Sequence, residues 1–318
     1  MNVIFIVNEQ AGGGKAAAVW SKYKQQLSIP YTEHNTEYAG HAIEIARSYT
    51  NQSVTEEDSR YLIVAVGGDG TVHEVIEGVA GSEHIIVGAM KAGSGNDFAR
   101  GYTVFSTIEQ LELYVEQETL AYTTNDLGQL QWADQKSSFV NNTGVGFDAY
   151  VVQLVNRSKL KKLLNTIKLG KLAYLIFTVW ALFTFKRFHS RIYNEGKVLE
   201  FREVWFIAVC NQPYFGGGMK ISPRSSTSDQ KLELTVVHQL SRIKLLTVFL
   251  TVFWGKHERF KEVSLLQGSE FELELQADVA AHVDGESLGR IPAQQRITCC
   301  LDERRWKLAD HSQRSRTS

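Results

Sequence analysis

The chain has 318 residues, which is long for a single core and sufficient for two domains. Its composition, with 43% hydrophobic and 22% charged residues and a net charge of -1, is typical of a soluble globular protein and excludes a generally basic surface, so we expect no nucleic acid as a partner. Its three cysteines, Cys210, Cys299 and Cys300, have the spacing of neither a disulfide framework nor a zinc site, and favour a reducing, cytoplasmic compartment.

The first part of the chain alternates short apolar runs with helical patterns. We expect strands at residues 3–7, 61–66 and 85–89, and helices at residues 16–27, 41–48, 71–80 and 107–116. This alternation predicts a doubly wound α/β domain, in which helices cover both faces of a mostly parallel sheet. Ligands of such sheets bind at the carboxyl ends of the strands.

From about residue 124 the pattern becomes one of hairpins. The expected strands are 124–130, 138–142, 191–193, 198–209, 231–238, 262–266, 271–276 and 281–283, and helical segments at 150–185 and 242–254 interrupt them. We therefore predict a C-terminal antiparallel β-sandwich domain with helical insertions, and an active site in the cleft between the two domains. The expected boundaries are 1–123 with 296–310 for the α/β domain, 124–295 for the β-sandwich domain, and 311–318 for a flexible tail.

A glycine-rich turn joins the strand at 61–66 to the helix at 71–80. It consists of Gly67, Gly68, Asp69, Gly70 and Thr71, and the N–H groups that open a helix after such a turn suit a phosphate. The carboxylate of Asp69 would repel phosphate unless a divalent metal or a water lay between them, so it indicates Mg²⁺. The structural alternative is an ordinary turn with Asp69 near the helix N-cap.

Two other polar loops follow predicted strands at the same edge of the sheet. Residues 8–15 contain three consecutive glycines and Lys15, but their spacing is not that of a P-loop, and a plain glycine-rich turn is an equal alternative. Residues 91–100 contain Ser94 between two glycines, followed by Asn96 and Asp97. One such loop is explained by helix capping, whereas three loops that converge on one edge predict a nucleotide site.

Near the C-terminus, two carboxylates flank a glycine at the end of a predicted strand. Asp284, Gly285 and Glu286 suit a tight hairpin turn, which is the simplest interpretation. A kinase, however, needs a carboxylate that accepts the proton of the attacking hydroxyl, and the second domain offers no better placed pair.

Four motifs, taken in order, resemble those of the bacterial diacylglycerol kinase-like lipid kinases, which share a catalytic domain with diacylglycerol, sphingosine and ceramide kinases. The motifs are GGDGTVHEV at 67–75, GSGNDFAR at 93–100, NNTGVGFD at 141–148 and VDGE at 283–286. The resemblance extends from Asn8 to about Leu301, which is nearly the whole chain.

This resemblance implies ATP and Mg²⁺ as cofactors and a role for each matching residue. It implies that Glu286 is the general base beside Asp284, and that Asp69, Asp97 and Asp126 order Mg²⁺ and water around the phosphates. The other nucleotide-site positions are Asn8, Gly12, Lys15, Thr36, Gly67, Gly68, Gly70, Thr71, His73, Ser94 and Asn96.

The family also has a structural Mg²⁺ site, which the resemblance assigns to Asp229 with backbone carbonyls of Ser226 and Lys231. A solvated Asp in a serine-rich loop is an equal alternative. The chain departs from the family at Glu9, where Pro is usual, and at His73, where Asn is common; a plain polar residue in the first helical turn explains His73 as well as a nucleotide role does.

A basic and aromatic region suggests how such a protein meets a lipid. No acidic residue occurs between Asp148 and Glu195, while nine basic residues do, around an apolar stretch at 172–185 that is too short to span a bilayer. Residues 242–261 repeat this composition, which is that of segments lying on an anionic membrane surface. The alternative is that both segments pack on the core with a solvated basic face.

We predict an ATP-dependent kinase that transfers the γ-phosphoryl group to a lipid hydroxyl, such as that of diacylglycerol, at the inner face of the cell membrane. One alternative is an NAD kinase, which also has a GGDGT loop. Another is a nucleotide-sensing, membrane-associated protein without catalysis. The sequence leaves open whether the chain forms a homodimer.

Overall fold

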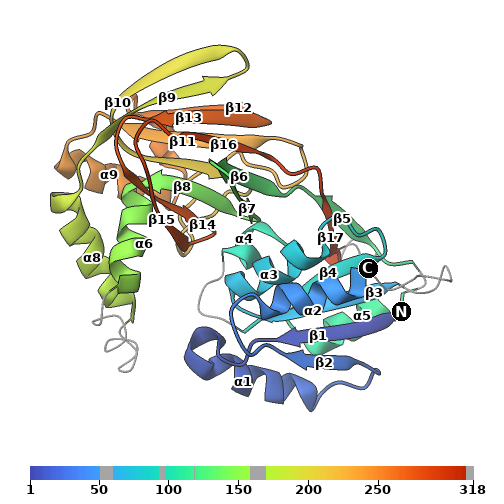
Figure 1. The fold of residues 1–318 in the computed structure, drawn as a ribbon. Coiled ribbons are helices and arrows are strands. Elements are labelled where there is room, and N and C mark those ends of the chain that lie inside the picture. Colours follow the sequence, from blue (N-terminus) through green and yellow to red (C-terminus); the bar gives the residue numbers. More distant parts are fainter. Residues whose placement is uncertain (51–59, 93–96, 118, 158–169, 313–318) are drawn as a thin grey trace. The chain divides into compact units, whose positions relative to one another are not determined.

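The computed structural model describes residues 1–50, 60–92, 97–117, 119–157 and 170–312 (Figure 1). The chain divides into two compact units, Met1–Leu127 with Glu303–Ser318, and Gly128–Asp302. These boundaries differ from the expected ones by a few residues on each side. The chain returns from the second unit to the first after residue 302, later than expected, because residues 296–301 form the strand β16 (Arg296–Leu301). This strand pairs with two strands of the second unit.

Unit 1 is an α/β unit with a six-stranded sheet in the order β2-β1-β3-β4-β17-β5. Every pair is parallel except β17 with β5. The strands are β1 (Asn2–Val7), β2 (Thr32–Asn35), β3 (Tyr61–Gly67), β4 (Ile85–Lys91), β5 (Tyr122–Asn125) and β17 (Trp306–Ala309). The helices are α1 (Ala11–Lys24), α2 (His41–Thr50), α3 (Asp69–Val79), α4 (Phe98–Gly101) and α5 (Ile108–Val115).

The residues of β1 show why this sheet needs helices on both faces. Val3 to Val7 are all buried, so neither face of the strand meets water. On one face, Phe5 belongs to a core cluster with Trp20 from α1 and Tyr114 from α5. The predicted doubly wound α/β domain is confirmed, and β2, α4 and β17 are elements that the apolar pattern did not indicate.

Unit 2 is built from eleven antiparallel strands. Their hydrogen-bonded order is β15-β14-β8-β10-β9-β13-β16-β6-β7, and β11 pairs with β10 and β12. The strands besides β16 are β6 (Gly128–Trp132), β7 (Gln135–Phe139), β8 (Asn142–Gly146), β9 (Phe188–Asn194), β10 (Lys197–Cys210), β11 (Leu232–His238), β12 (Val263–Gly268), β13 (Glu270–Leu275), β14 (Val279–Val283) and β15 (Glu286–Ile291). The helices are α6 (Phe147–Arg157), α8 (Gly170–Thr184), α9 (Arg242–Val252) and the 3₁₀ helix η1 (Lys256–Arg259).

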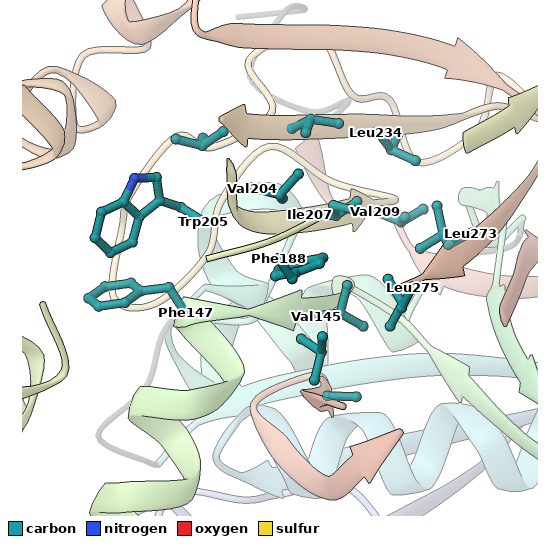
Figure 2. Close-up of a cluster of buried hydrophobic side chains, with 14 of the residues drawn as sticks. Val145, Phe147, Phe188, Val204, Trp205, Ile207, Val209, Leu234, Leu273 and Leu275 are labelled. Atoms are coloured by element: carbon teal, nitrogen blue, oxygen red, sulfur yellow. The ribbon is translucent and has the colours of Figure 1, made fainter. Parts of the chain in front are cut away.

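The long strand β10 takes part in both layers of the sandwich. Its first part pairs with β9, its last part pairs with β8 and β11, and the register shifts between Phe201 and Val204. Side chains such as Ile207 of β10, Val145 of β8 and Leu273 of β13 gather in one buried cluster (Figure 2). This arrangement confirms the predicted β-sandwich with helical insertions.

Three expected elements in the second half differ in detail. Residues 138–142, expected as one strand, contain the end of β7 and the start of β8. Residues 124–130 form two strands, β5 and β6, which belong to different sheets because the chain passes from one unit to the other after Leu127. The helical segment expected at 150–185 contains α6 and α8, and residues 158–169 between them lie outside the described part of the chain. No described helix is long and apolar enough to cross a membrane.

Candidate active site

The polar loops of unit 1 start at the same edge of its sheet. The N–H of Asn8, directly after β1, donates to the carbonyl of Val66 at 2.9 Å, and the N–H of Thr36, directly after β2, donates to that of Val7 at 2.9 Å. The N–H of Ala92, after β4, donates to the carbonyl of Gly67 at 3.1 Å. The carboxyl ends of four neighbouring strands therefore bring these loops side by side, as the parallel sheet predicted.

The turn at 67–71 is held closely against the first loop. The side-chain amide of Asn8 donates to the hydroxyl of Thr71 at 3.1 Å. A Cβ on Gly67 would lie 2.6 Å from Cβ of Thr71, so only glycine fits at this position. Helix α3 begins at Asp69, and its N-cap residue is Gly68, which has no side chain to cap the helix. An N-terminus without a side-chain cap suits an anion.

Asp69 contacts the loop that follows β4. Its Oδ2 accepts a hydrogen bond from the backbone N–H of Asp97 at 3.2 Å. The carboxylate of Asp97 in turn lies 3.1 Å from the guanidinium of Arg100. The two residues that the resemblance assigned to the same function are thus in contact through the backbone N–H of Asp97. Two further predicted positions in this loop, Ser94 and Asn96, lie outside the described residues.

Asp126 is buried, and Trp306 connects it to the same loop. Its Oδ1 lies 2.9 Å from Nε of Arg305, and its backbone carbonyl accepts the indole N–H of Trp306 at 3.2 Å. The ring of Trp306 lies 6.2 Å from that of Phe98, the residue after Asp97. The ion pair with Arg305 is a contact that the motif pattern did not indicate.

The remaining predicted nucleotide positions border this edge. Gly12 lies in a run of three glycines with positive φ at the start of α1, and Lys15 directly after this run is exposed. His73, the fifth residue of α3, is half-buried. Glu74 is not among the predicted positions. Its carboxylate accepts the N–H groups of Gly40 and Ala42 at 3.0 and 3.2 Å and so fixes the start of α2 after Thr36.

In unit 2, the Asp-Gly-Glu segment is a tight turn between β14 and β15. Asp284 and Gly285 both have positive φ, 44° and 83°, so the hairpin interpretation is correct for the backbone. The side chain of Asp284 has a second function, because its carboxylate accepts three backbone N–H groups, from Val140 at 2.8 Å, Asn141 at 2.9 Å and Asn142 at 2.8 Å. These contacts favour positioning of the turn over proton transfer.

A buried histidine and a buried aspartate support the same turn. Nε2 of His282 lies 3.0 Å from Oδ2 of Asp148, and the N–H of Gly285 donates to Nδ1 of His282 at 3.4 Å. Because Nδ1 is an acceptor here, Nε2 carries the proton and donates to the carboxylate. A Cβ on Gly144, the strand partner of His282, would lie 2.5 Å from Oδ2 of Asp148, so glycine makes the room for this pair.

Glu286 begins β15 directly after this turn, and its side chain is exposed. Asp284 fixes the turn that carries Glu286. His282, at the end of the preceding strand, is fixed by its hydrogen bond to Asp148. The predicted base is therefore an accessible carboxylate on a backbone that packing and hydrogen bonds hold in place. Its role in proton transfer stays a prediction.

The expected structural metal site is a surface loop. Asp229 is exposed, and its Oδ1 accepts the N–H of Lys231 at 3.1 Å, while Ser226 is half-buried. Nearby Glu233 is buried, and burial is the main cause that raises its pKa above the ordinary value. The described residues contain no group of three or more His, Cys, Asp or Glu suited to a metal. A single carboxylate with backbone carbonyls remains compatible with a hard cation, and the site stays a prediction.

The α/β unit has polar loops at one edge of its sheet, and the sandwich carries a fixed Asp-Gly-Glu turn. Together these features are those expected of a two-domain kinase. Residues 2–126 match the diacylglycerol kinase catalytic domain, and residues 141–300 match the YegS C-terminal NAD kinase beta sandwich-like domain. The chain belongs to the bacterial diacylglycerol kinase-like lipid kinase family.

Known relatives resemble the chain over most of its length. It is 29% identical over 293 residues to "Putative lipid kinase YtlR" of Bacillus subtilis, an alignment that covers 91% of this chain and 94% of the relative. It is 28% identical over 235 residues to a "Diacylglycerol kinase" of Mycobacterium tuberculosis, covering 73% and 72%. A crystal structure described as a putative diacylglycerol kinase from Bacillus anthracis shares the fold, with a TM-score of 0.72, 22% identity and 97% of both chains covered.

Proposed function

We propose that the protein is an ATP-dependent lipid kinase that transfers the γ-phosphoryl group to the hydroxyl of diacylglycerol or a related membrane lipid. The observation that carries the proposal is the exposed Glu286 on a turn that three hydrogen bonds to Asp284 hold in place. A protein that only binds a nucleotide has no need of a fixed, accessible carboxylate of this kind. The names of the curated relatives support the lipid as acceptor.

The proposed nucleotide site is the strand edge of unit 1. The N-terminus of α3, which no side chain caps, offers backbone N–H groups and the positive end of the helix to the phosphates. Lys15, exposed after the glycine run, adds a cation for them. These groups offset the phosphate charge, which is the main task of a phosphoryl-transfer enzyme.

The proposed metal residues are Asp69, Asp97 and Asp126. Oxygen donors of this kind suit Mg²⁺, which when bound would neutralise charge on the transferred phosphoryl group. The hydrogen bond from the N–H of Asp97 orients the carboxylate of Asp69. Asp126, whose carboxylate is held beside Arg305, is proposed to help to order Mg²⁺ and water around the phosphates.

Proton transfer is assigned to the second unit. Glu286 would accept the proton of the attacking lipid hydroxyl, and such a base contributes about 10²–10⁴-fold to the rate. Asp284 holds the turn, and we propose that it acts on the reaction through the position of Glu286.

The test is a labelled-ATP assay with Mg²⁺ over mixed membrane lipids, with NAD as a separate acceptor. We expect a phosphorylated lipid, no phosphorylated NAD, and loss of the product in Asp69→Asn without loss of the fold by circular dichroism. Asp134→Asn, which changes an exposed carboxylate in the loop between β6 and β7, is the matched control and should keep full activity. Phosphorylation of NAD alone would replace this proposal with the NAD kinase alternative.

A further inference from the structure

Exposed apolar side chains are concentrated on two helices of unit 2. Of the fourteen large hydrophobic side chains exposed in the described part of the chain, nine lie on α8, on α9 or on the two residues directly after α9. We call these nine residues the α8–α9 ridge; they are Ile176, Val179, Trp180, Phe183, Ile243, Leu246, Leu250, Phe253 and Trp254. Exposed hydrophobic residues are normally scattered singly, so this grouping indicates a surface that binds something.

The spacing of the ridge is helical on both elements. On α8 its members recur at i, i+3, i+4 and i+7 from Ile176, and on α9 the same ridge begins at Ile243, which is 80% exposed. The opposite face of α9 packs on the sandwich, and its residues Leu245 and Val248 are buried in the sandwich core. Each helix therefore has one apolar face that folding uses and a second that it does not require.

A side-chain hydrogen bond connects the start of α9 to the end of α8, so the exposed residues beside this bond lie close to each other. Nε of Arg242, the first residue of α9, donates to the carbonyl of Leu182 near the end of α8 at 3.0 Å. Both helices lie on the same side of the sandwich (Figure 1). Phe183 and Ile243, the residues next to this contact, are 65% and 80% exposed.

The border of the ridge is basic. Lys186, Arg242, Lys256 and Arg259 are exposed around it. The acidic residues that pack below α9 are already paired: Glu262 lies 2.6 Å from Lys244 and Glu258 lies 3.0 Å from Arg224. The sequence has no acidic residue between Asp148 and Glu195 or between Glu233 and Glu258. The surface thus combines exposed apolar side chains with positive charge.

We propose that the α8–α9 ridge docks the protein onto an anionic lipid bilayer, with its apolar side chains in the headgroup and upper acyl region. Trp180 and Trp254, 51% and 70% exposed, have the amphipathic rings that favour this interface, and the basic border complements anionic headgroups. A second copy of the chain is a poorer occupant, because two basic borders would face each other. The inference rests on the proposed function only for the identity of the substrate, which such a surface would reach in the bilayer.

The test measures binding of the full chain to vesicles without ATP. The vesicles contain phosphatidylcholine alone or phosphatidylcholine with phosphatidylglycerol, and the bound fraction is read by co-sedimentation. In the triple variant Leu250→Ser, Phe253→Ser, Trp254→Ser, the affinity for both kinds of vesicle should fall at least about tenfold, because the apolar contact of these side chains with lipid is lost. The pair Lys256→Glu, Arg259→Glu should weaken binding only to the anionic vesicles. Leu113→Ser, which changes a residue of α5 in unit 1 that is 42% exposed, is the matched control and should bind like the unchanged protein.

A second measurement does not depend on how well the triple variant folds. Nitroxide-labelled lipids should quench the fluorescence of the unchanged protein, and Trp254→Phe, which keeps the residue apolar, should bind equally but lose part of that quenching. Vesicle binding that is unchanged in a correctly folded triple variant would overturn the proposal. The proposal would also be overturned if the triple variant changed from a dimer to a monomer and still bound vesicles, because the ridge would then be a contact between copies of the chain.

The kinase assay separates this inference from the proposed function. With a short-chain, water-soluble diacylglycerol as acceptor, the triple variant should keep its activity, while with diacylglycerol in vesicles it should lose most of it. If the chain phosphorylated neither acceptor but the triple variant still lost vesicle binding, the proposed function would fail and the docking surface would stand.

Discussion

The three hydrogen bonds to Asp284 allow a direct test of whether this residue positions the turn or transfers a proton. Val140, Asn141 and Asn142 are each buried, so their N–H groups cannot readily turn to water if the carboxylate is removed. A buried donor without a partner costs about 1–3 kcal/mol. Asp284→Ala, even at the lower limit for each of the three amides, should therefore cost about 3 kcal/mol in local stability. The positive φ of 44° at this position adds a smaller cost, because Asp tolerates left-handed backbone better than Ala does.

Asp284→Asn is the graded control. Its amide oxygen can replace Oδ1, which accepts the N–H groups of Asn141 and Asn142. Its NH₂ group would replace Oδ2 and face the N–H of Val140, a donor against a donor. We expect a loss of about 1–2 kcal/mol, smaller than that of Asp284→Ala.

The measurement is amide hydrogen exchange at residues 140–142, followed by mass spectrometry. A local measurement is preferable here because a chain of two compact units need not unfold in one step. Exchange should be fastest in Asp284→Ala, intermediate in Asp284→Asn and slowest in the unchanged protein, and kinase activity should decrease in the same order. If Asp284→Asn abolished activity as fully as Asp284→Ala while the amides at 140–142 stayed protected, the positioning role would be refuted and Asp284 would take part in proton transfer.

Three other substitutions test the remaining parts of this unit. Glu286→Gln should reduce phosphorylation about 10²–10⁴-fold and leave the melting temperature unchanged, because the side chain is exposed; near-normal activity would rule out Glu286 as the base. Gly144→Ala should destabilise the protein by about 1–3 kcal/mol in urea unfolding, since its Cβ would lie 2.5 Å from Asp148 and 2.8 Å from His282; an unchanged midpoint would show that the pair moves freely. Burial raises the pKa of Glu233, so the stability linked to its protonated form is complete at acid pH and is lost as the pH rises through the raised value. Glu233→Gln should therefore gain stability relative to the unchanged protein as the pH rises, and a constant difference across the pH range would contradict this.

The strand edge of unit 1 was predictable because a local rule governs it. Each polar loop directly follows a short apolar strand, and in a parallel sheet all such loops lie at one edge. The positions of Asn8 and Gly67 follow from that rule, together with the apolar runs on each side of them. Asp126 was different, because its partner Arg305 comes from the returning end of the chain, and nothing in either local pattern specifies their contact.

The exposed ridge on α9 shows the opposite limit. Residues 242–252 are apolar on most sides, and this pattern equally suits a buried helix and a surface helix with a bound partner. Which face is buried depends on the sandwich strands that the helix packs against, and these are distant in the sequence. Only the structure shows that Leu245 and Val248 face the core while Ile243 and Leu250 face outward.

The NNTGVGFD and VDGE motifs are more than 130 residues apart in sequence, and the structure joins them into one unit around β8 and β14. The first residues of the earlier motif donate their N–H groups to Asp284, its central Gly144 leaves room for His282, and its final Asp148 accepts from that histidine. A motif that looks like a glycine-rich strand therefore holds in place the turn that carries Glu286. The motif acts mainly through backbone N–H groups and through the space that Gly144 leaves, and side-chain chemistry in the sequence reveals neither. The function of its residues becomes visible only when the turn that they hold is known.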